Sequence, residues 1–380
     1  MLGFRAGAGG IGRVMVTLMR GLLRRGVEID LLLPAGDYPD LDEVAGAVSI
    51  HPLETGSPER ARSQLRAYLA DRRPRALLSN RDLTHALLAA HDWGAHGGAH
   101  DGGAHDGKTD RPRIGLRIGT DVPEKLRRQN PLSAPLKRRQ LARLYQAADV
   151  LIAISPGVGD ALRGMLRGRP GPEIRTIWNP VDAERVRRAA QQPVVHRWLS
   201  DRPGPLIVSV GRLVRAKNYT LLLRALARIA EPLDARLIIC GEGNQRRRLE
   251  TLAERLGIAG RVDLPGHVAN PFPLMAAADL FIVSSLFEGG NNALMEAMTL
   301  GIRCVSTDCR SGPGDVLAGG ALGPLVPVGD DRALADAMRR GLSDPVDRAA
   351  LLAGAERFDL DDSARAYALA LGLSGRDGGR

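Results

Sequence analysis

Short, nearly uninterrupted apolar runs recur along this chain, and segments with helical spacing separate them. In the second half these runs cover residues 205–210, 236–240, 280–284 and 302–307. Runs of this length, apolar on both faces, are typical of strands that are buried on both sides of a parallel sheet. Their alternation with helices predicts an α/β fold, in which helices cover both faces of each sheet.

The first half repeats this alternation, so the 380 residues predict two doubly wound, Rossmann-like domains. Between the halves lies IWNPVD, residues 177–182, whose Asn-Pro pair interrupts regular structure and indicates a linker. We therefore expect an N-terminal domain over 1–180 and a C-terminal domain over 181–361. Residues 362–380 are expected to form a helix, packed back on the N-terminal domain, and a tail.

One segment departs from the α/β pattern. Residues 94–107, GAHGGAHDGGAHDG, repeat Gly-Ala-His, and so many glycines predict a flexible surface insertion. A metal site at His96, His100 and His105 is the alternative interpretation. Nothing in the sequence fixes those three side chains in one geometry, so the insertion is the favoured prediction.

The composition limits the classes of partner. The formal charge of +10 favours an anionic partner, although a general richness in arginine explains it equally well. Aromatic residues make up only 3%, which argues against a nucleic-acid site built on stacked rings. Cys240, Cys304 and Cys309 form no CxxC pair. Cys240 and Cys304 lie in apolar runs, so buried, reduced thiols in a cytoplasmic protein are expected.

The N-terminal stretch GAGGIG, residues 7–12, matches the G-x-G-x-x-G pattern of dinucleotide-binding proteins. That fingerprint requires a strand before the first glycine, and only six residues precede Gly7 here. Either the true start lies upstream or the first strand is degenerate. The stretch alone therefore supports an NAD-dependent oxidoreductase only weakly. Its small residues, Gly9 and Gly10 among them, still allow a phosphate to approach a helix N-terminus.

The most informative stretch follows the run that ends at Ser284. Ligands of open parallel sheets bind beyond the carboxyl ends of the strands, which is where Glu288 is expected. Glu296 follows eight residues later, one turn inside a predicted helix. Backbone amides and a helix N-terminus suit a phosphate, and carboxylates suit sugar hydroxyls. Two glycines and two asparagines directly follow the first acid: Gly289, Gly290, Asn291 and Asn292.

Cations are expected at the same edge of this sheet. The run 205–210 ends at a glycine, Gly211, and Arg212 and Lys217 follow before the next helix. Two cations beside a strand end suit a diphosphate, which arginine can bind through its fork and lysine as a point charge. Solvated surface cations are the alternative interpretation.

In these motifs the chain resembles the retaining glycosyltransferases of family 4, which have the two-domain GT-B fold. The resemblance rests on the Glu288-to-Glu296 element, on SVGRL with Lys217, and on IICGEG, RVDLPGHV and STDCRSGP in the expected order. It implies a hexosyltransferase that uses a nucleoside diphosphate sugar, a UDP-sugar by expectation, and a hydroxyl acceptor such as a lipid-linked or cell-surface glycan precursor. It implies no metal and no cofactor, because the nucleotide sugar is itself a substrate.

The resemblance also assigns residues. Arg212 and Lys217 would bind the diphosphate, Glu288 would contact the donor sugar near the reacting carbon, and Glu296 would bind the ribose. The remaining contacts would come from backbone: Gly211, Gly289, Gly290, Asn291 and Asn292 beside phosphate and sugar, Gly266 and His267 beside the base, and Gly9 and Gly10 from the N-terminal loop.

Two departures from the family pattern qualify these assignments. The family often has a histidine at the end of a later N-domain strand, but residues 114–121 read IGLRIGTD. His85 lies on a different segment, so no N-domain catalytic residue is assigned. A non-catalytic nucleotide-sugar-binding protein is a further alternative, which the intact Arg212, Lys217, Glu288 and Glu296 set argues against.

A basic stretch at 124–144 points to a membrane. It is rich in Lys and Arg, has one acid, and reads as one long helix. Such a surface can contact an anionic leaflet, so we expect peripheral contact with the inner face of a membrane. A solvated basic helix is the alternative interpretation.

Overall fold

The computed structural model describes residues 10–36, 38–54, 56–93, 111–201, 204–229 and 233–373. The chain forms two compact units. The N-terminal unit consists of Met1–Pro180 with Leu360–Arg380, and the C-terminal unit of Val181–Asp359. The last helix, α17 (Leu360–Ala370), therefore belongs to the N-terminal unit, and it begins two residues before the expected position 362.

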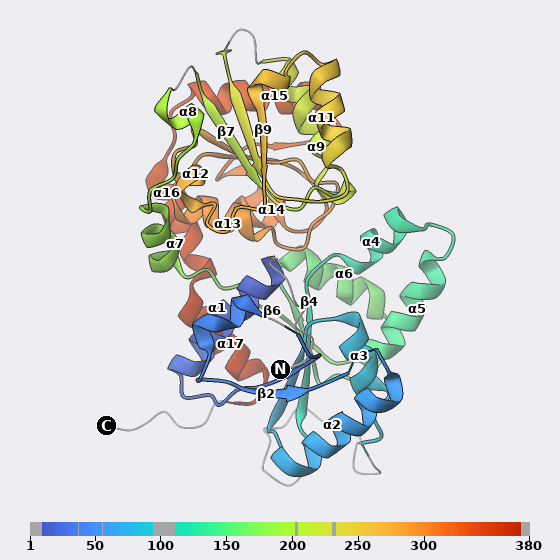
Figure 1. Cartoon of the computed structure of the whole chain (residues 1–380). Helices are drawn as coiled ribbons and strands as arrows, with labels where there is room; N and C mark the ends of the chain where they lie inside the picture. Colours follow the sequence, from blue (N-terminus) through green and yellow to red (C-terminus); the bar gives the residue numbers. More distant parts are fainter. Residues whose placement is uncertain are drawn as a thin grey trace. The chain divides into compact units, whose positions relative to one another are not determined.

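The C-terminal unit contains a six-stranded sheet in which every pairing is parallel (Figure 1). The central strand is β7 (Leu206–Val210), and the chain reverses its direction of winding there. In spatial order the strands are β12 (Leu325–Val326), β11 (Cys304–Thr307), β10 (Leu280–Val283), β7, β8 (Arg236–Cys240) and β9 (Val262–Gly266).

Helices cover both faces of this sheet, because its central strands are apolar on both sides. On one face α9 (Tyr219–Ala227), α11 (Arg246–Arg255) and α15 (Asp331–Ser343) share one core cluster with the strands. On the other face α12 (Phe272–Ala276) and α13 (Asn292–Thr299) contact β7 and β10. Each fully buried Leu or Ile in such a core stabilises the fold by about 1.5–3 kcal/mol. Representative buried members are Ile207, Leu222, Leu237, Leu280, Val305 and Met338.

The N-terminal unit contains two parallel sheets. One has the order β3 (Ala76–Ser79), β4 (Arg113–Ile118), β5 (Val150–Ala153) and β6 (Glu173–Thr176), and the other pairs β1 (Asp30–Leu33) with β2 (Ser49–Pro52). The remaining long helices of this unit are α1 (Gly10–Arg24), α2 (Pro58–Arg72), α3 (Asp82–Ala89), α4 (Val122–Gln129), α5 (Ala134–Tyr145) and α6 (Pro156–Leu166).

The C-terminal helix is integrated into the N-terminal unit through α1. A Cβ atom at Gly21 of α1 would lie 2.7 Å from Cβ of Ala364 in α17. The two helices therefore pack at a distance that only glycine allows, and Tyr367 of α17 is completely buried in the same cluster. Close helix packing explains why the chain returns to its first unit.

The prediction of a single basic helix at 124–144 is wrong, because this stretch forms two helices, α4 and α5. Pro131 follows Asn130, which ends α4, and proline restricts the residue before it to extended conformations. The Asn130 side chain then accepts a hydrogen bond from the Ser133 amide at 3.1 Å, which stabilises the turn.

Some expectations fall on residues that the structure does not describe, namely the start of the GAGGIG loop and the repeat at 94–107. Among the helices in the described ranges, none combines the length and the apolar character that crossing a bilayer requires.

Candidate active site

Backbone hydrogen bonds join the loops that follow three neighbouring strands of the C-terminal sheet. The amide of Gly211, after β7, donates to the Cys240 carbonyl at 3.0 Å. The amide of Gly241, after β8, donates to the Gly266 carbonyl at 2.7 Å. A Cβ atom at Gly241 would lie 1.9 Å from the Gly211 carbonyl oxygen, so the two loops touch backbone to backbone. This contact explains the glycines of SVGRL and IICGEG in physical terms.

Three further hydrogen bonds fix the loop after β10 to its neighbours. The Leu286 amide donates to the Ala216 carbonyl at 2.8 Å, and the Ser284 hydroxyl to the Lys217 carbonyl at 2.8 Å. On the other side, the Thr307 hydroxyl at the end of β11 donates to the Ser285 carbonyl at 2.7 Å. The loops that carry Lys217 and Glu288 are thereby held side by side.

Lys217 and Glu288 form a half-buried ion pair at this edge of the sheet. Nζ of Lys217 lies 2.6 Å from Oε1 of Glu288, and their side chains are 22% and 13% exposed. The same oxygen accepts hydrogen bonds from the Ser285 hydroxyl at 2.6 Å and from Nδ2 of Asn291 at 3.3 Å. Three donors on one carboxylate oxygen fix the position of the Glu288 side chain.

Asn291 connects this carboxylate to helix α13. Its backbone is left-handed, with φ of 54°, and its side-chain oxygen accepts a hydrogen bond from the Leu294 amide at 3.1 Å. Asparagine tolerates this conformation, and one side chain both caps the helix and contacts Glu288. Asn291 is therefore the N-cap residue of α13.

The loop after β11 packs against the turn that contains Glu288. Gly312 there has φ of 92°, and a Cβ atom on it would lie 3.2 Å from Cβ of Glu288 and from the Gly290 amide nitrogen. Gly289 and Gly290 are themselves buried. A larger residue at 312 would displace the turn that positions the carboxylate.

The other predicted residues occupy the same edge with different exposure. Arg212 is exposed directly after Gly211, His267 is exposed directly after β9, and Glu296 is half-buried in the second turn of α13. The structure therefore brings Lys217, Glu288 and Asn291 into direct contact and places the remaining C-terminal residues around them. Gly10 is the first residue of α1 in the other unit, and Gly9 lies outside the described residues.

Sequence reasoning did not include Ser285 or Tyr219. Ser285 is a hydroxyl at the carboxyl end of a buried strand, and that position was a usable signal. Tyr219 is 3% exposed, and its hydroxyl would be 2.9 Å from a Cβ atom at Gly211, so it lies directly behind this loop. Burial raises the pKa of Tyr219 well above its usual range, which keeps the phenol protonated.

Two kinds of ionisable group in the C-terminal unit have shifted pKa values: an ion-paired carboxylate and buried thiols. Arg246 binds Glu242 of IICGEG at 2.6 Å, and this contact lowers the pKa of Glu242 to about 2. The three cysteines are buried and unpaired, as expected, and burial raises the pKa of Cys240 to about 12. A buried, protonated thiol is not a nucleophile, so these cysteines contribute packing only.

Known proteins match both halves of the chain. The family model for glycosyltransferase family 4 matches residues 8–185, and that for glycosyl transferases group 1 matches residues 195–358. A Campylobacter jejuni relative is N-acetylgalactosamine-N,N'-diacetylbacillosaminyl-diphospho-undecaprenol 4-alpha-N-acetylgalactosaminyltransferase. It is 30% identical over 224 residues, or 59% of each chain. The lipopolysaccharide core biosynthesis glycosyltransferase LpsE of Rhizobium meliloti is 31% identical over 53% of this chain and 56% of its own. The chain thus spans about half the length of the curated relatives it matches.

Solved structures show the same fold over nearly the whole chain. Anabaena Alr3699/HepE, in complex with UDP and glucose, has a TM-score of 0.74 at 19% identity and covers 98% of both chains. The lipopolysaccharide outer core galactosyltransferase WaaB has a TM-score of 0.68 at 19% identity and covers 97% of both. The predicted α/β architecture with two Rossmann-like domains is therefore confirmed. This chain belongs to the family 4, group 1 glycosyltransferases of the GT-B fold.

Proposed function

We propose that this protein transfers a hexosyl group from a nucleoside diphosphate sugar, with UDP as the nucleotide, to a hydroxyl acceptor and retains the anomeric configuration. The observation that carries the proposal is the Lys217–Glu288 pair beside the Asn291-capped end of α13. Its position at the carboxyl edge of a parallel sheet is where such folds bind ligands. Support for the nucleotide comes from the similar solved structures that contain UDP and UDP-glucose.

The chemistry requires stabilisation of a leaving diphosphate. In the proposed reaction the bond from the anomeric carbon to the diphosphate oxygen breaks, and a bond to the acceptor oxygen forms on the same face. The acceptor's proton passes to the departing phosphate. The negative charge that develops is offset by Arg212, by Lys217 and by the N-terminal end of α13. Glu296 binds the ribose hydroxyls, and Glu288 holds Lys217 while it contacts the donor sugar.

For the acceptor we propose a lipid-linked or cell-surface glycan precursor. The names of several relatives support this class, since one acts on a diphospho-undecaprenol-linked sugar and others belong to lipopolysaccharide core synthesis. Substrates of this kind are presented at a membrane, and we propose that the protein acts on its cytoplasmic face.

The turn between α4 and α5 is the proposed membrane contact. Leu132, in the turn, is 95% exposed, and Leu136, in the first turn of α5, is 63% exposed. Basic residues surround them on both helices, and an anionic bilayer binds exposed apolar side chains and basic residues together. The basic neighbours are Lys125, Arg127, Arg128, Lys137, Arg138 and Arg139.

A screen of UDP-sugars, each with and without a lipid-linked saccharide acceptor, tests the proposed function. Transfer of labelled sugar, or slow hydrolysis of one donor when acceptor is absent, is the expected result. Binding of UDP-sugars without transfer or hydrolysis would favour the non-catalytic binding protein instead. Binding and turnover of NAD(H) would favour the oxidoreductase.

A further inference from the structure

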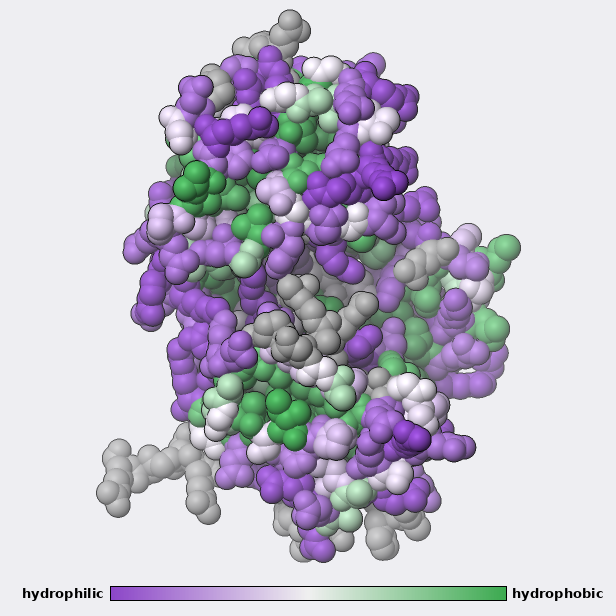
Figure 2. Space-filling view, viewed as in Figure 1, coloured by the Kyte–Doolittle hydropathy of each residue, from purple (hydrophilic) through white to green (hydrophobic). Residues whose placement is uncertain are grey.

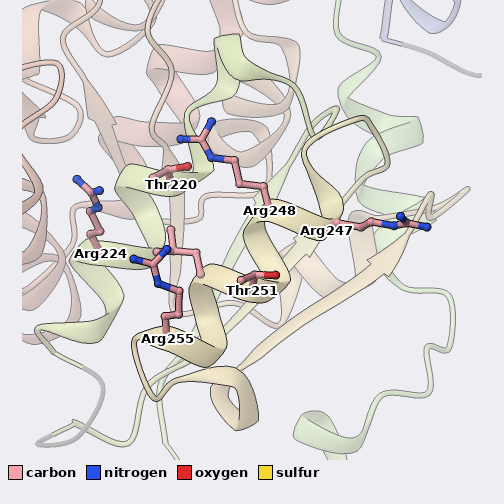
Figure 3. A pocket seen from close by; sticks show the side chains of 7 residues that line it. Thr220, Arg224, Arg247, Arg248, Thr251 and Arg255 are labelled. Atoms are coloured by element: carbon pink, nitrogen blue, oxygen red, sulfur yellow. The ribbon is translucent and has the colours of Figure 1, made fainter.

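A concave site lies between helices α9 and α11 of the C-terminal unit. Its volume is about 330 Å³, which is within the range of small-molecule sites. The seven lining residues include four arginines, two threonines and one leucine (Figure 3). They are Thr220, Arg224, Arg247, Arg248, Thr251, Leu252 and Arg255.

Helical spacing places these side chains together. Thr220 and Arg224 are four residues apart on α9, and Thr251 and Arg255 are four apart on α11, so each pair shares one helix face. Leu252 packs on the core cluster beneath and gives the site an apolar floor. Figure 3 shows the Arg224, Arg248 and Arg255 side chains on the side where α11 faces α9, whereas the Arg247 side chain points away from them.

Three arginines of this site differ in their pairing from two neighbouring arginines. Neighbouring arginines are paired: Arg228 with Asp331 at 2.5 Å, and Arg246 with Glu242 and Glu250 at 2.6 and 3.1 Å. Arg224, Arg248 and Arg255 form no ion pair within 4.0 Å with any carboxylate of the described ranges. Strongly hydrophilic residues cover the surface over α11 (Figure 2).

We propose that this pocket, hereafter the α9–α11 pocket, is a second anion site that binds phosphoryl groups. Arginine side chains from two helices line the same pocket, and two threonine side chains line it with them. A tetrahedral phosphate presents oxygens in several directions, whereas a single carboxylate is satisfied by one fork. None of the lining residues belongs to the candidate active site, so this site is additional to the proposed donor site.

A charge-matched pair of variants tests the proposal. Arg224→Gln/Arg255→Gln removes one cation from each helix of the pocket. Arg187→Gln/Arg340→Gln removes two exposed cations from α7 (Ala183–Ala190) and α15 of the same unit. Inorganic pyrophosphate binding is measured by calorimetry at low ionic strength. Vesicles of phosphatidylglycerol and of phosphatidylcholine are compared by sedimentation, and melting temperatures confirm that both variants fold.

The control variant should bind pyrophosphate like the native protein, and the pocket variant about tenfold more weakly or worse, because each charge-assisted hydrogen bond contributes appreciably. Arg247→Gln should weaken binding less, since that side chain points away. Loss of pyrophosphate binding alone supports a soluble phosphate ligand, and loss of phosphatidylglycerol binding supports a lipid headgroup. Equal binding of both probes by the pocket and control variants overturns the proposal. Pyrophosphate that binds at the proposed donor site affects both variants equally. The difference between the variants therefore reports on the pocket even if the proposed glycosyltransferase function is wrong.

Discussion

Nζ of Lys217 lies 2.6 Å from Oε1 of Glu288, although 71 positions separate the two residues in the chain. The lysine follows β7 and the glutamate follows β10, and the sheet places these two strands side by side. Hydroxyl and amide donors from Ser285 and Asn291 complete the contact. The proposed catalytic groups are therefore part of the packing at this edge, and function and stability are coupled there.

Replacing Lys217 alone should destabilise the fold more than replacing Lys217 and Glu288 together. Lys217→Met leaves a half-buried carboxylate without its cation, and we expect a loss of about 1–3 kcal/mol in the free energy of unfolding. Lys217→Met/Glu288→Gln should recover much of that loss but none of the activity, since the proposed diphosphate contact is missing. Urea unfolding of both single variants and the double variant gives the coupling energy. Additive losses would show that the pair contributes no mutual stabilisation.

Arg212 and Glu296 should differ in the step that they affect. Glu296→Ala removes the proposed ribose contact, which exists in the ground state, so nucleotide affinity should be lost. Arg212→Ala removes an exposed cation that acts on developing charge, so turnover should fall about 100-fold or more while nucleotide affinity changes little. Calorimetry with UDP and steady-state rates separate the two effects. Wild-type affinity in Glu296→Ala would contradict the assignment.

The backbone contact at Gly241 predicts a specific intolerance to a methyl group. Gly241→Ala places Cβ against the Gly211 carbonyl, at 1.9 Å in the present geometry, and must separate two site loops. We expect a destabilisation of about 1–3 kcal/mol, as for overpacked cores, together with weaker donor binding. Gly260→Ala is the matched control, because a Cβ there meets nothing within 4 Å. Similar melting temperatures for the two variants would show that the loops yield without cost.

A buried histidine in the N-terminal unit predicts a dependence of stability on pH. His85 on α3 is 2% exposed, and burial lowers its pKa to about 4, against an opposing effect of Asp82. The folded state therefore binds fewer protons than the unfolded state, and stability should fall as the pH drops from about 6.5 to about 4, by roughly 3 kcal/mol. Urea unfolding across this pH range should show a smaller slope for His85→Leu. An unchanged slope would mean that other groups cause the acid sensitivity.

How accurately the sequence predicted a strand depends on the position of that strand in its sheet. The central strands β7, β8 and β10 were predicted almost to the residue, because burial on both faces leaves an apolar run. Strands β2, β6 and β12, which have no apolar run of this kind, all lie at sheet edges. Edge strands carry polar or charged residues, such as Glu173 and Arg175 of β6, or are only two residues long, as β12 is.

For the candidate site, the sequence likewise predicted some features and not others. The carboxyl edge of the second sheet, and the residues that gather there, followed from glycines and charges after apolar runs. The contact between Lys217 and Glu288 could not be predicted, because it depends on β7 lying next to β10 and not on the order of the strands in the chain. The division of the basic stretch into α4 and α5 was available from Pro131, whose restriction of Asn130 is a local effect.

The exposed leucines of the α4–α5 turn give a prediction about membranes. Leu132→Ser/Leu136→Ser removes apolar side chains that are 95% and 63% exposed, so the fold should keep its melting temperature. Each buried methylene contributes about 0.8 kcal/mol to bilayer insertion, so the native protein should bind phosphatidylglycerol vesicles far more strongly than this variant. Leu83→Ser, at an exposed leucine on α3, is the control that should leave binding unchanged. Salt should weaken the native interaction, because the basic neighbours attract anionic headgroups over about one Debye length. If the native protein binds to vesicles of no lipid composition in a flotation assay, this turn has no membrane role.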